Sequence, residues 1–109
     1  ISQGLIARLK YDLTAINNNN SAVSFSLSQN YPNPFNPVTG IKYDIPRTGF
    51  VTLKIFNSIG MDVVKLVNET KQQGTHEVTW DASDFPSGVY FYELSAGGFT
   101  ERKKMVLVK

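Results

Sequence analysis

The chain of 109 residues is long enough for one domain of ordinary size, and its 41% apolar and 12% aromatic residues can supply a core. Its net charge of +2 gives no indication of nucleic-acid binding, and the lack of cysteine excludes disulfide bonds and thiolate metal sites. No apolar stretch approaches the roughly 20 residues of a membrane-spanning helix.

The first segment, residues 1–16, fits two structures. Apolar residues from Leu5 to Leu13 alternate with mostly polar ones, as in a half-buried strand, but apolar residues also recur at helical spacing. We favour a strand, either the tail of a preceding domain or an extra strand of this one. The chain begins at Ile1 without a leader, so we expect it to be the C-terminal part of a longer protein. Residues 17–24 begin with four asparagines and are predicted to be a linker.

Residues 30–40, NYPNPFNPVTG, place three prolines and three asparagines around Tyr31 and Phe35. Each proline lacks a backbone donor and restricts the residue before it, so regular ladder pairing is excluded. The two rings are too apolar for a flexible spacer. We therefore predict an extended, partly polyproline-like segment over one end of the domain, with Phe35 buried and the asparagine side chains bonded to local backbone.

Seven short segments show the alternation of β-strands, and turn-forming residues separate them. They cover residues 25–27, 41–46, 50–57, 61–68, 76–80, 89–95 and 99–109. No connection is long enough for a crossover helix, which favours antiparallel pairing. The sequence therefore predicts an all-β fold, an antiparallel immunoglobulin-like β-sandwich of about seven strands.

The sequence offers no catalytic constellation, and we predict no catalytic residue, cofactor or metal. His76 is the single histidine, and nothing marks a nucleophile or a carboxylate partner for it. Asp81 and Asp84 lie in a loop, where two carboxylates fall well short of the roughly six to eight oxygens that surround calcium. We interpret both as turn residues that bond their own backbone. The nine acidic residues form no preferred pair for glycoside hydrolysis.

The last strand, within residues 101–109, carries a net charge of +3. Met105 and Leu107 alternate with Val106 and Val108, and lysines stand on both sides. Lysines on an edge strand discourage unwanted pairing, so this segment fits an ordinary protected edge. It equally fits a strand that a partner recognises, for example through strand addition.

Three segments, in this order, resemble the type A C-terminal sorting domain of the type IX (Por) secretion system. They are LSQNYPNPFNPVTGIKYDIP, GFVTLKIFNSIGMDVVKLVN and SGVYFYELSAGGFTERKKMVLVK, and the match runs from residue 25 to residue 109. The most specific parts are the YPNP motif, the GVY triplet and the terminal KMVLVK. The segments are also similar to the immunoglobulin-like domain of flagellar hook-capping proteins, a related β-sandwich.

The resemblance implies a non-catalytic secretion signal in bacteria of the Bacteroidetes–Chlorobi group. Residues 25–109 would be the sorting domain, and residues 1–16 the tail of a cargo domain in the same chain. The implied partners are an outer-membrane translocon, reached through the periplasm, and sortase-like components at the cell surface. The protein would then be secreted or held at the surface. Cleavage near residues 17–22 with surface attachment, and release without it, both stay open.

The resemblance also assigns residues to recognition and to structure. The positions that match the family motifs for recognition are Gly88, Tyr90, Lys104, Met105, Leu107 and Lys109. The structural motif consists of Tyr31, Pro32, Asn33, Pro34 and Phe35. The alternative function is an accessory carbohydrate-binding or structural β-sandwich module of a secreted hydrolase. Its candidate sugar-stacking residues are Trp80, Phe91, Tyr92 and Phe99.

Overall fold

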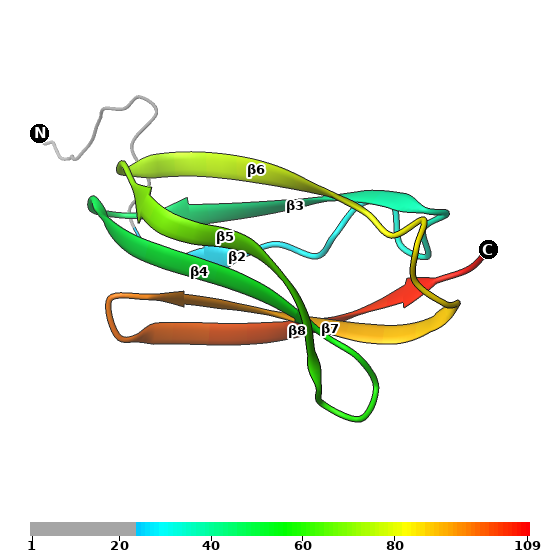
Figure 1. Cartoon of the computed structure of the whole chain (residues 1–109). Coiled ribbons are helices and arrows are strands. Elements are labelled where there is room, and N and C mark those ends of the chain that lie inside the picture. Colours follow the sequence, from blue (N-terminus) through cyan, green and yellow to red (C-terminus); the bar gives the residue numbers. More distant parts are fainter. Residues whose placement is uncertain (1–23) are drawn as a thin grey trace, which may run out of the picture.

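The computed structural model describes residues 24–109, which form two antiparallel sheets packed face to face (Figure 1). One sheet has the strand order β2-β3-β6 and the other the order β5-β4-β7-β8. The strands are β2 (Ser26–Leu27), β3 (Val38–Ile45), β4 (Gly49–Phe56), β5 (Asp62–Lys71), β6 (Gly74–Asp81), β7 (Gly88–Ala96) and β8 (Phe99–Leu107). The predictions for residues 1–16 and for the linker up to residue 23 fall outside the described residues.

The predicted all-β sandwich of seven strands is confirmed within the described residues, and each predicted segment overlaps one strand. The main differences in boundaries lie at the start of β3 and between β5 and β6. β3 begins at Val38, directly after the last proline of the proline-rich segment, where backbone donors are again available for pairing. β5 runs to Lys71 and β6 starts at Gly74, so the loop predicted at residues 70–75 is shorter. These two strands belong to different sheets, and the chain needs only a short crossing between them.

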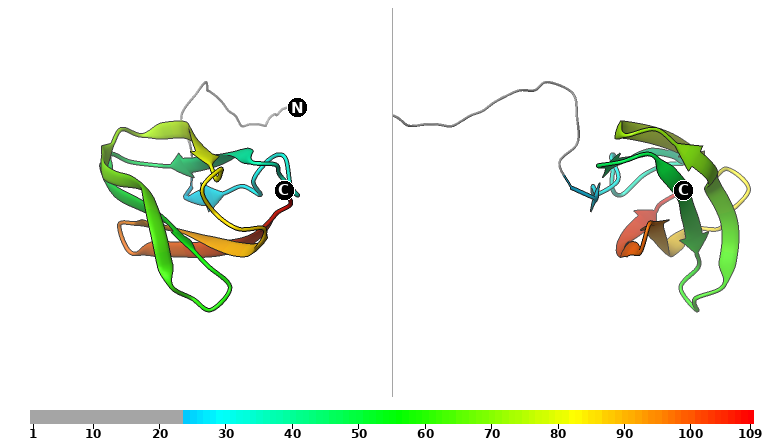
Figure 2. Two further views of the ribbon diagram at one scale, coloured as in Figure 1. Left: turned by 45° about the vertical axis from the view of Figure 1, so that its right-hand side comes forward. Right: turned by 90° about the vertical axis from the view of Figure 1, so that its left-hand side faces the viewer.

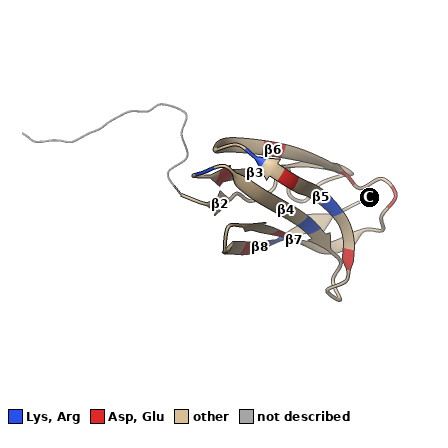
Figure 3. Cartoon of the chain, turned by 60° about the vertical axis from the view of Figure 1, so that its left-hand side comes forward, with Lys and Arg blue, Asp and Glu red and all other residues tan. Residues whose placement is uncertain are grey.

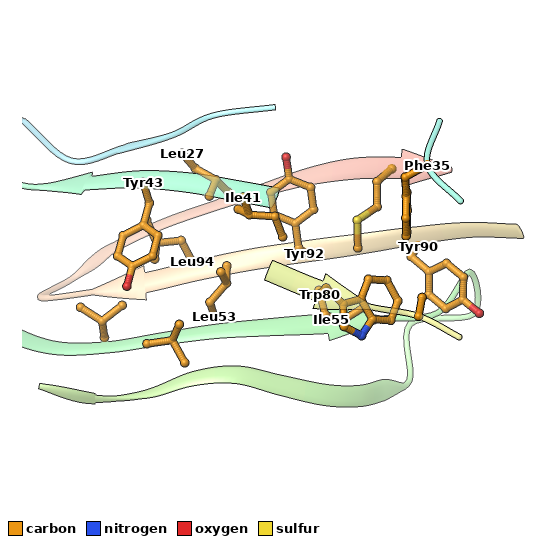
Figure 4. Packing of buried hydrophobic residues seen from close by; sticks show 14 of the residues in the cluster. Leu27, Phe35, Ile41, Tyr43, Leu53, Ile55, Trp80, Tyr90, Tyr92 and Leu94 are labelled. Carbon is orange, nitrogen blue, oxygen red and sulfur yellow. The ribbon is translucent and has the colours of Figure 1, made fainter. Parts of the chain in front are cut away.

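The core lies between the two sheets, where every second residue of the strands points inward (Figure 4). Burial of a large apolar side chain contributes roughly 1.5 to 3 kcal/mol, so this layer is the main source of stability. Both edges of the core are closed by aromatic rings. The buried residues are Leu27, Phe35, Ile41, Tyr43, Ile45, Val51, Leu53, Ile55, Val67, Trp80, Ala82, Tyr90, Tyr92, Leu94, Ala96, Met105 and Leu107.

Two connections between neighbouring strands differ in length. The turn between β7 and β8 consists of Gly97 and Gly98, with φ of 53° and 92°, and forms a two-residue hairpin. The connection between β4 and β5 is longer and projects away from the sandwich in both views of Figure 2. Among the described strands, β7 is the only neighbour of β8 in its sheet, so β8 forms an edge of that sheet.

The proline-rich segment connects β2 and β3 of one sheet and contacts β8 of the other sheet on the way. β2 pairs with β3, whereas Phe35 forms an isolated parallel bridge with Leu107 of β8. Phe35 is 2% exposed, which confirms its predicted burial. The Tyr31 ring is 83% exposed, although its backbone exchanges hydrogen bonds with Gly40. The segment therefore closes one side of the sandwich by backbone contacts and a single buried ring.

Candidate recognition site at the terminal strand

The structure brings the six predicted recognition residues together. Five of them lie on the paired strands β7 and β8, and the sixth, Lys109, lies two residues after the end of β8. Gly88 is opposite Leu107 in the register of the two strands, and Tyr90 is opposite Met105. Gly88 has φ of 151°, a value that side-chain-bearing residues rarely adopt, and this explains why glycine opens the strand.

Burial divides these residues into two groups. Met105, Leu107 and Tyr90 are 0%, 1% and 4% exposed, whereas Lys104 and Lys109 are exposed. In the folded domain a partner has no access to the Met105 or Leu107 side chain. These two residues anchor β8 in the core and thereby fix the position of the lysines beside them.

An aromatic cluster around Trp80 packs between the sheets at one end of the core (Figure 4). Tyr90 meets Trp80 edge to face at 5.4 Å between ring centroids, and Phe35 lies 5.7 Å from Trp80. Phe85 packs on the other side of Trp80 at 5.3 Å. The Tyr90 hydroxyl donates to the Pro86 carbonyl at 2.7 Å, and burial raises the pKa of this phenol. The cluster joins β6, β7, their connecting loop and the proline-rich segment.

The proline-rich segment covers the outward edge of β8 next to the recognition residues. Phe35 N–H donates to the Val106 carbonyl, and Val108 N–H donates to the Phe35 carbonyl, both at 2.9 Å. Asn33 Oδ1 accepts from Val106 N–H at 3.0 Å. The prediction of local asparagine bonds holds for Asn30, which donates to Pro32, but it is wrong for Asn33. This contact was missed because alternation gives no information about the path of an irregular segment.

Lys109 is held by the loop between β6 and β7. Its N–H donates to Ser87 Oγ at 3.0 Å, and its ammonium donates to the Ser83 carbonyl at 2.5 Å. Asp81 organises the same loop, because its carboxylate accepts from both the hydroxyl and the backbone N–H of Ser83. These two bonds, helped by the Lys109 charge, lower the pKa of Asp81. Asp81 is therefore the turn residue that the sequence predicts.

A shallow groove of about 240 Å³ lies beside Gly88, between the β4–β5 loop and the β6–β7 loop. Ile59 on its rim is 77% exposed, and Met61 in the same loop is 58% exposed. From the sequence, this loop is predicted only as a turn between two strands. Its apolar residues Ile59 and Met61 were the sequence signal for an exposed apolar surface.

The candidates for sugar stacking are poorly placed. Trp80 and Tyr92 are 3% and 0% exposed, and Phe91 and Phe99 are half-buried. Within the described range, no three histidine, cysteine or acidic side chains gather as metal ligands. The same range contains no helix with the length and apolar character of a membrane span.

Comparisons with known proteins place the chain among related sequences and folds. The family described as "Secretion system C-terminal sorting domain" matches residues 29–109. No curated protein gives a significant match. Among solved structures, the chain is similar to PorZ of Porphyromonas gingivalis, described as an essential bacterial surface component of the type-IX secretion system. The identity is 20% and the TM-score 0.51, over 82% of this chain and 12% of the PorZ chain.

Proposed function

Because the chain belongs to the family of secretion-system C-terminal sorting domains, we propose that the outer-membrane translocon of the type IX system recognises the outward face of β8 together with Lys109. Membership of the family makes the chain a non-catalytic signal domain of the type IX system that interacts with secretion machinery. The protein that carries it is secreted or attached to the cell surface.

The alternation along β8 is the observation that carries this proposal. Met105 and Leu107 point into the core, so the intervening residues point outward at fixed positions. Lys104 and Val108 are exposed, and Val106 is half-buried. A translocon that requires the KMVLVK sequence therefore contacts only part of it. The remaining part acts by holding the sandwich together.

The second feature of the β8 surface is its charge, and Figure 3 marks the basic and acidic residues along the ribbon. The four cations within residues 101–109 face a single acidic residue of the same stretch, Glu101. Glu101 pairs with Lys103 at 3.3 Å, and Arg102 approaches Glu93 at 3.4 Å. Among residues 24–109 no carboxylate lies within ion-pair distance of Lys104 or Lys109. Lys104 is thus available to acidic groups of a partner, and the exposed Lys109 ammonium, which also donates to the Ser83 carbonyl, carries a second positive charge beside it.

The proposal extends to the rest of the chain. Residues 1–16 are the tail of the cargo domain, and residues 17–24 are the linker at which cleavage separates cargo from signal. Sortase-like components at the cell surface then act on the released end. The position of the family match, which begins at residue 29, and the first described strand, at Ser26, support this division.

The test exchanges the charges of Lys104 and Lys109 in the full-length cargo protein. We expect Lys104→Glu combined with Lys109→Glu to reduce export by about tenfold or more, because like charges now face the acidic partner. The free energy of unfolding should fall by about 1 kcal/mol or less, since both side chains are exposed and Lys109 loses one hydrogen bond, to the Ser83 carbonyl. Cargo is measured in periplasm and medium by its own activity, and stability by denaturant unfolding.

The matched control places the same charge change on exposed lysines elsewhere. Lys42 lies on β3 and Lys65 on β5, and both are exposed. Lys42→Glu combined with Lys65→Glu should export normally. Normal export of the Lys104 and Lys109 variant, with its fold intact, would show that the translocon reads another surface.

A further inference from the structure

The outer edge of β8 presents backbone groups in a regular order. The two-residue turn makes Ala96 and Phe99 a hydrogen-bonded pair, as in any hairpin of this length. Bonded and non-bonded pairs alternate along antiparallel strands. Odd-numbered residues of β8 therefore bond to β7, and even-numbered residues direct their N–H and C=O groups outward.

The proline-rich segment occupies one half of this edge. The outward groups of Val106 and Val108 are bonded to Phe35 and Asn33, as described above. The side chain of Gln29 adds one bond, from Nε2 to the Lys104 carbonyl at 2.8 Å. The hydrogen bonds to this edge end at the Lys104 carbonyl; Gln29 lies just after β2, and the Phe25 ring before β2 stacks on Phe99 at 5.1 Å.

The other half of the edge is open within the described chain. Among residues 24–109 no group bonds to the outward N–H and C=O of Thr100 and Arg102, or to the N–H of Lys104. Six residues of strand, from Phe99 to Lys104, span roughly 20 Å at about 3.3 Å per residue. A short β-strand has this length.

We propose that residues 99–104 of β8 accept an acidic, extended segment of a partner protein as an added strand. The inference rests on the proposed function and specifies how a partner engages the same strand. Backbone pairing would supply affinity, and the side chains beside it would select the partner. Arg102 is 48% exposed and lies over the Phe56 ring at 4.6 Å, which holds its guanidinium on the outer face. Lys104 is exposed beside it.

Charge distinguishes between the possible occupants of the edge. A second copy of the chain would place Arg102 and Lys104 against the same cations, and like charges on neighbouring strands are destabilising. The alternating residues 5–13 of this chain carry Arg8 and Lys10 against a single acid, Asp12. An acidic segment of another protein is the occupant that complements the edge.

The test uses the isotope-labelled full chain and a defined peptide. The peptide has nine residues, alternates glutamate with threonine and has blocked ends, and its control replaces each glutamate by lysine. We expect the glutamate peptide to shift the amide signals of Thr100, Arg102 and Lys104 and to slow their hydrogen exchange by about tenfold. The amides of Val106 and Val108 should not change, because they are already bonded.

A proline variant tests the backbone pairing directly. Thr100→Pro removes an outward donor that makes no bond to β7, so the hairpin should persist, as its amide spectrum will show. Thr100→Pro should lose peptide binding, and Thr100→Ala should keep it. The shift map of the unaltered chain decides the question on its own if the proline variant fails to fold.

Several results would overturn the inference. They are equal binding of the lysine peptide, shifts confined to other strands, or no shifts at all. Concentration-dependent shifts without peptide would assign the edge to a second copy. Protection of the Thr100 and Arg102 amides in the free chain would assign it to the chain's own N-terminal residues. None of these results affects the export assay of the Lys104 and Lys109 variant, so the proposed recognition surface can survive the failure of strand addition.

Discussion

The Tyr92 hydroxyl joins the middle of β7 to the point where the chain leaves β2. It donates to the Ser28 carbonyl at 2.7 Å and accepts from Asn30 N–H at 2.8 Å. The residue is fully buried. Burial raises the pKa of Tyr92 to about 12, and the bond from Asn30 offsets only part of that effect. The folded state therefore favours the neutral phenol. The two hydrogen bonds of this group fix the start of the proline-rich segment.

The raised pKa predicts a loss of stability in alkaline solution. Folding favours the protonated form, so the contribution is complete below pH 10, the ordinary tyrosine value, and is lost as the pH rises toward about 12. The shift corresponds to about 2 to 3 kcal/mol in the free energy of unfolding. Denaturant unfolding at pH 9 and pH 12 measures the decrease.

Tyr92→Phe isolates the effect from other titrating groups. This variant should be less stable at pH 9 by about 1 to 3 kcal/mol, because two buried backbone groups lose their partner. Its stability should then fall less steeply up to pH 12. The same steepness in both proteins would mean that other groups cause the alkaline decrease.

At the scale of elements, the strands could be predicted because their residues alternate. Val51, Leu53 and Ile55 point inward from β4, as the pattern indicates, and Met105 and Leu107 do so from β8. The same alternation could have separated the buried from the exposed members of the candidate site. The family resemblance marks these positions without distinguishing their roles, so it leaves buried and exposed residues in one set.

The path of the proline-rich segment could not be predicted in the same way. Prolines remove the periodicity from which a face or an edge is inferred. Asn33 meets Val106 across a separation of 73 residues, and neither residue carries a local signal for the other. Burial of Phe35 was predictable from its apolar ring, whereas its pairing with β8 depends on the assembled sandwich.

We expect Asn33→Ala to loosen this edge without unfolding the domain. The substitution removes the acceptor of Val106 N–H, which costs about 1 kcal/mol of stability. Local exchange of the Val106 amide should accelerate roughly fivefold, as measured by hydrogen-exchange NMR. Asn36→Ala is the matched control, since Asn36 is exposed in the same segment. Unchanged hydrogen-exchange protection of the Val106 amide in the Asn33→Ala variant would show that Asn33 does not hold this edge of β8.

At the scale of the whole molecule, the end of the chain is part of the core. Removing residues 104–109 deletes Met105 and Leu107 and leaves Phe35 without its backbone partners. Losses of about 2 to 5 kcal/mol for each large core residue are comparable with the total stability of a domain, about 5 to 15 kcal/mol. We therefore expect the truncated domain to unfold and its cargo to remain in the periplasm with its own activity intact.

Circular dichroism of the truncated domain and the location of the cargo measure the two effects. The truncation alone does not separate lost folding from lost recognition, whereas exchange of the exposed lysine charges does. A truncated cargo that still reached the medium normally would show that export does not depend on this strand.

The bond between Asn33 and Val106 also has a consequence for synthesis. It closes a loop that contains nearly all of the described domain, so it forms only after the ribosome has delivered residue 106. Contacts between residues far apart in the sequence form late in folding, because closing the long loop between them costs entropy. Until then Phe35 lacks its backbone partners on β8, and the pairing of β7 with β8 is incomplete. Chaperones and proteases act on such partly folded states. A cargo protein in which Asn33 is bonded to Val106 therefore carries a signal domain that was made at least as far as residue 106.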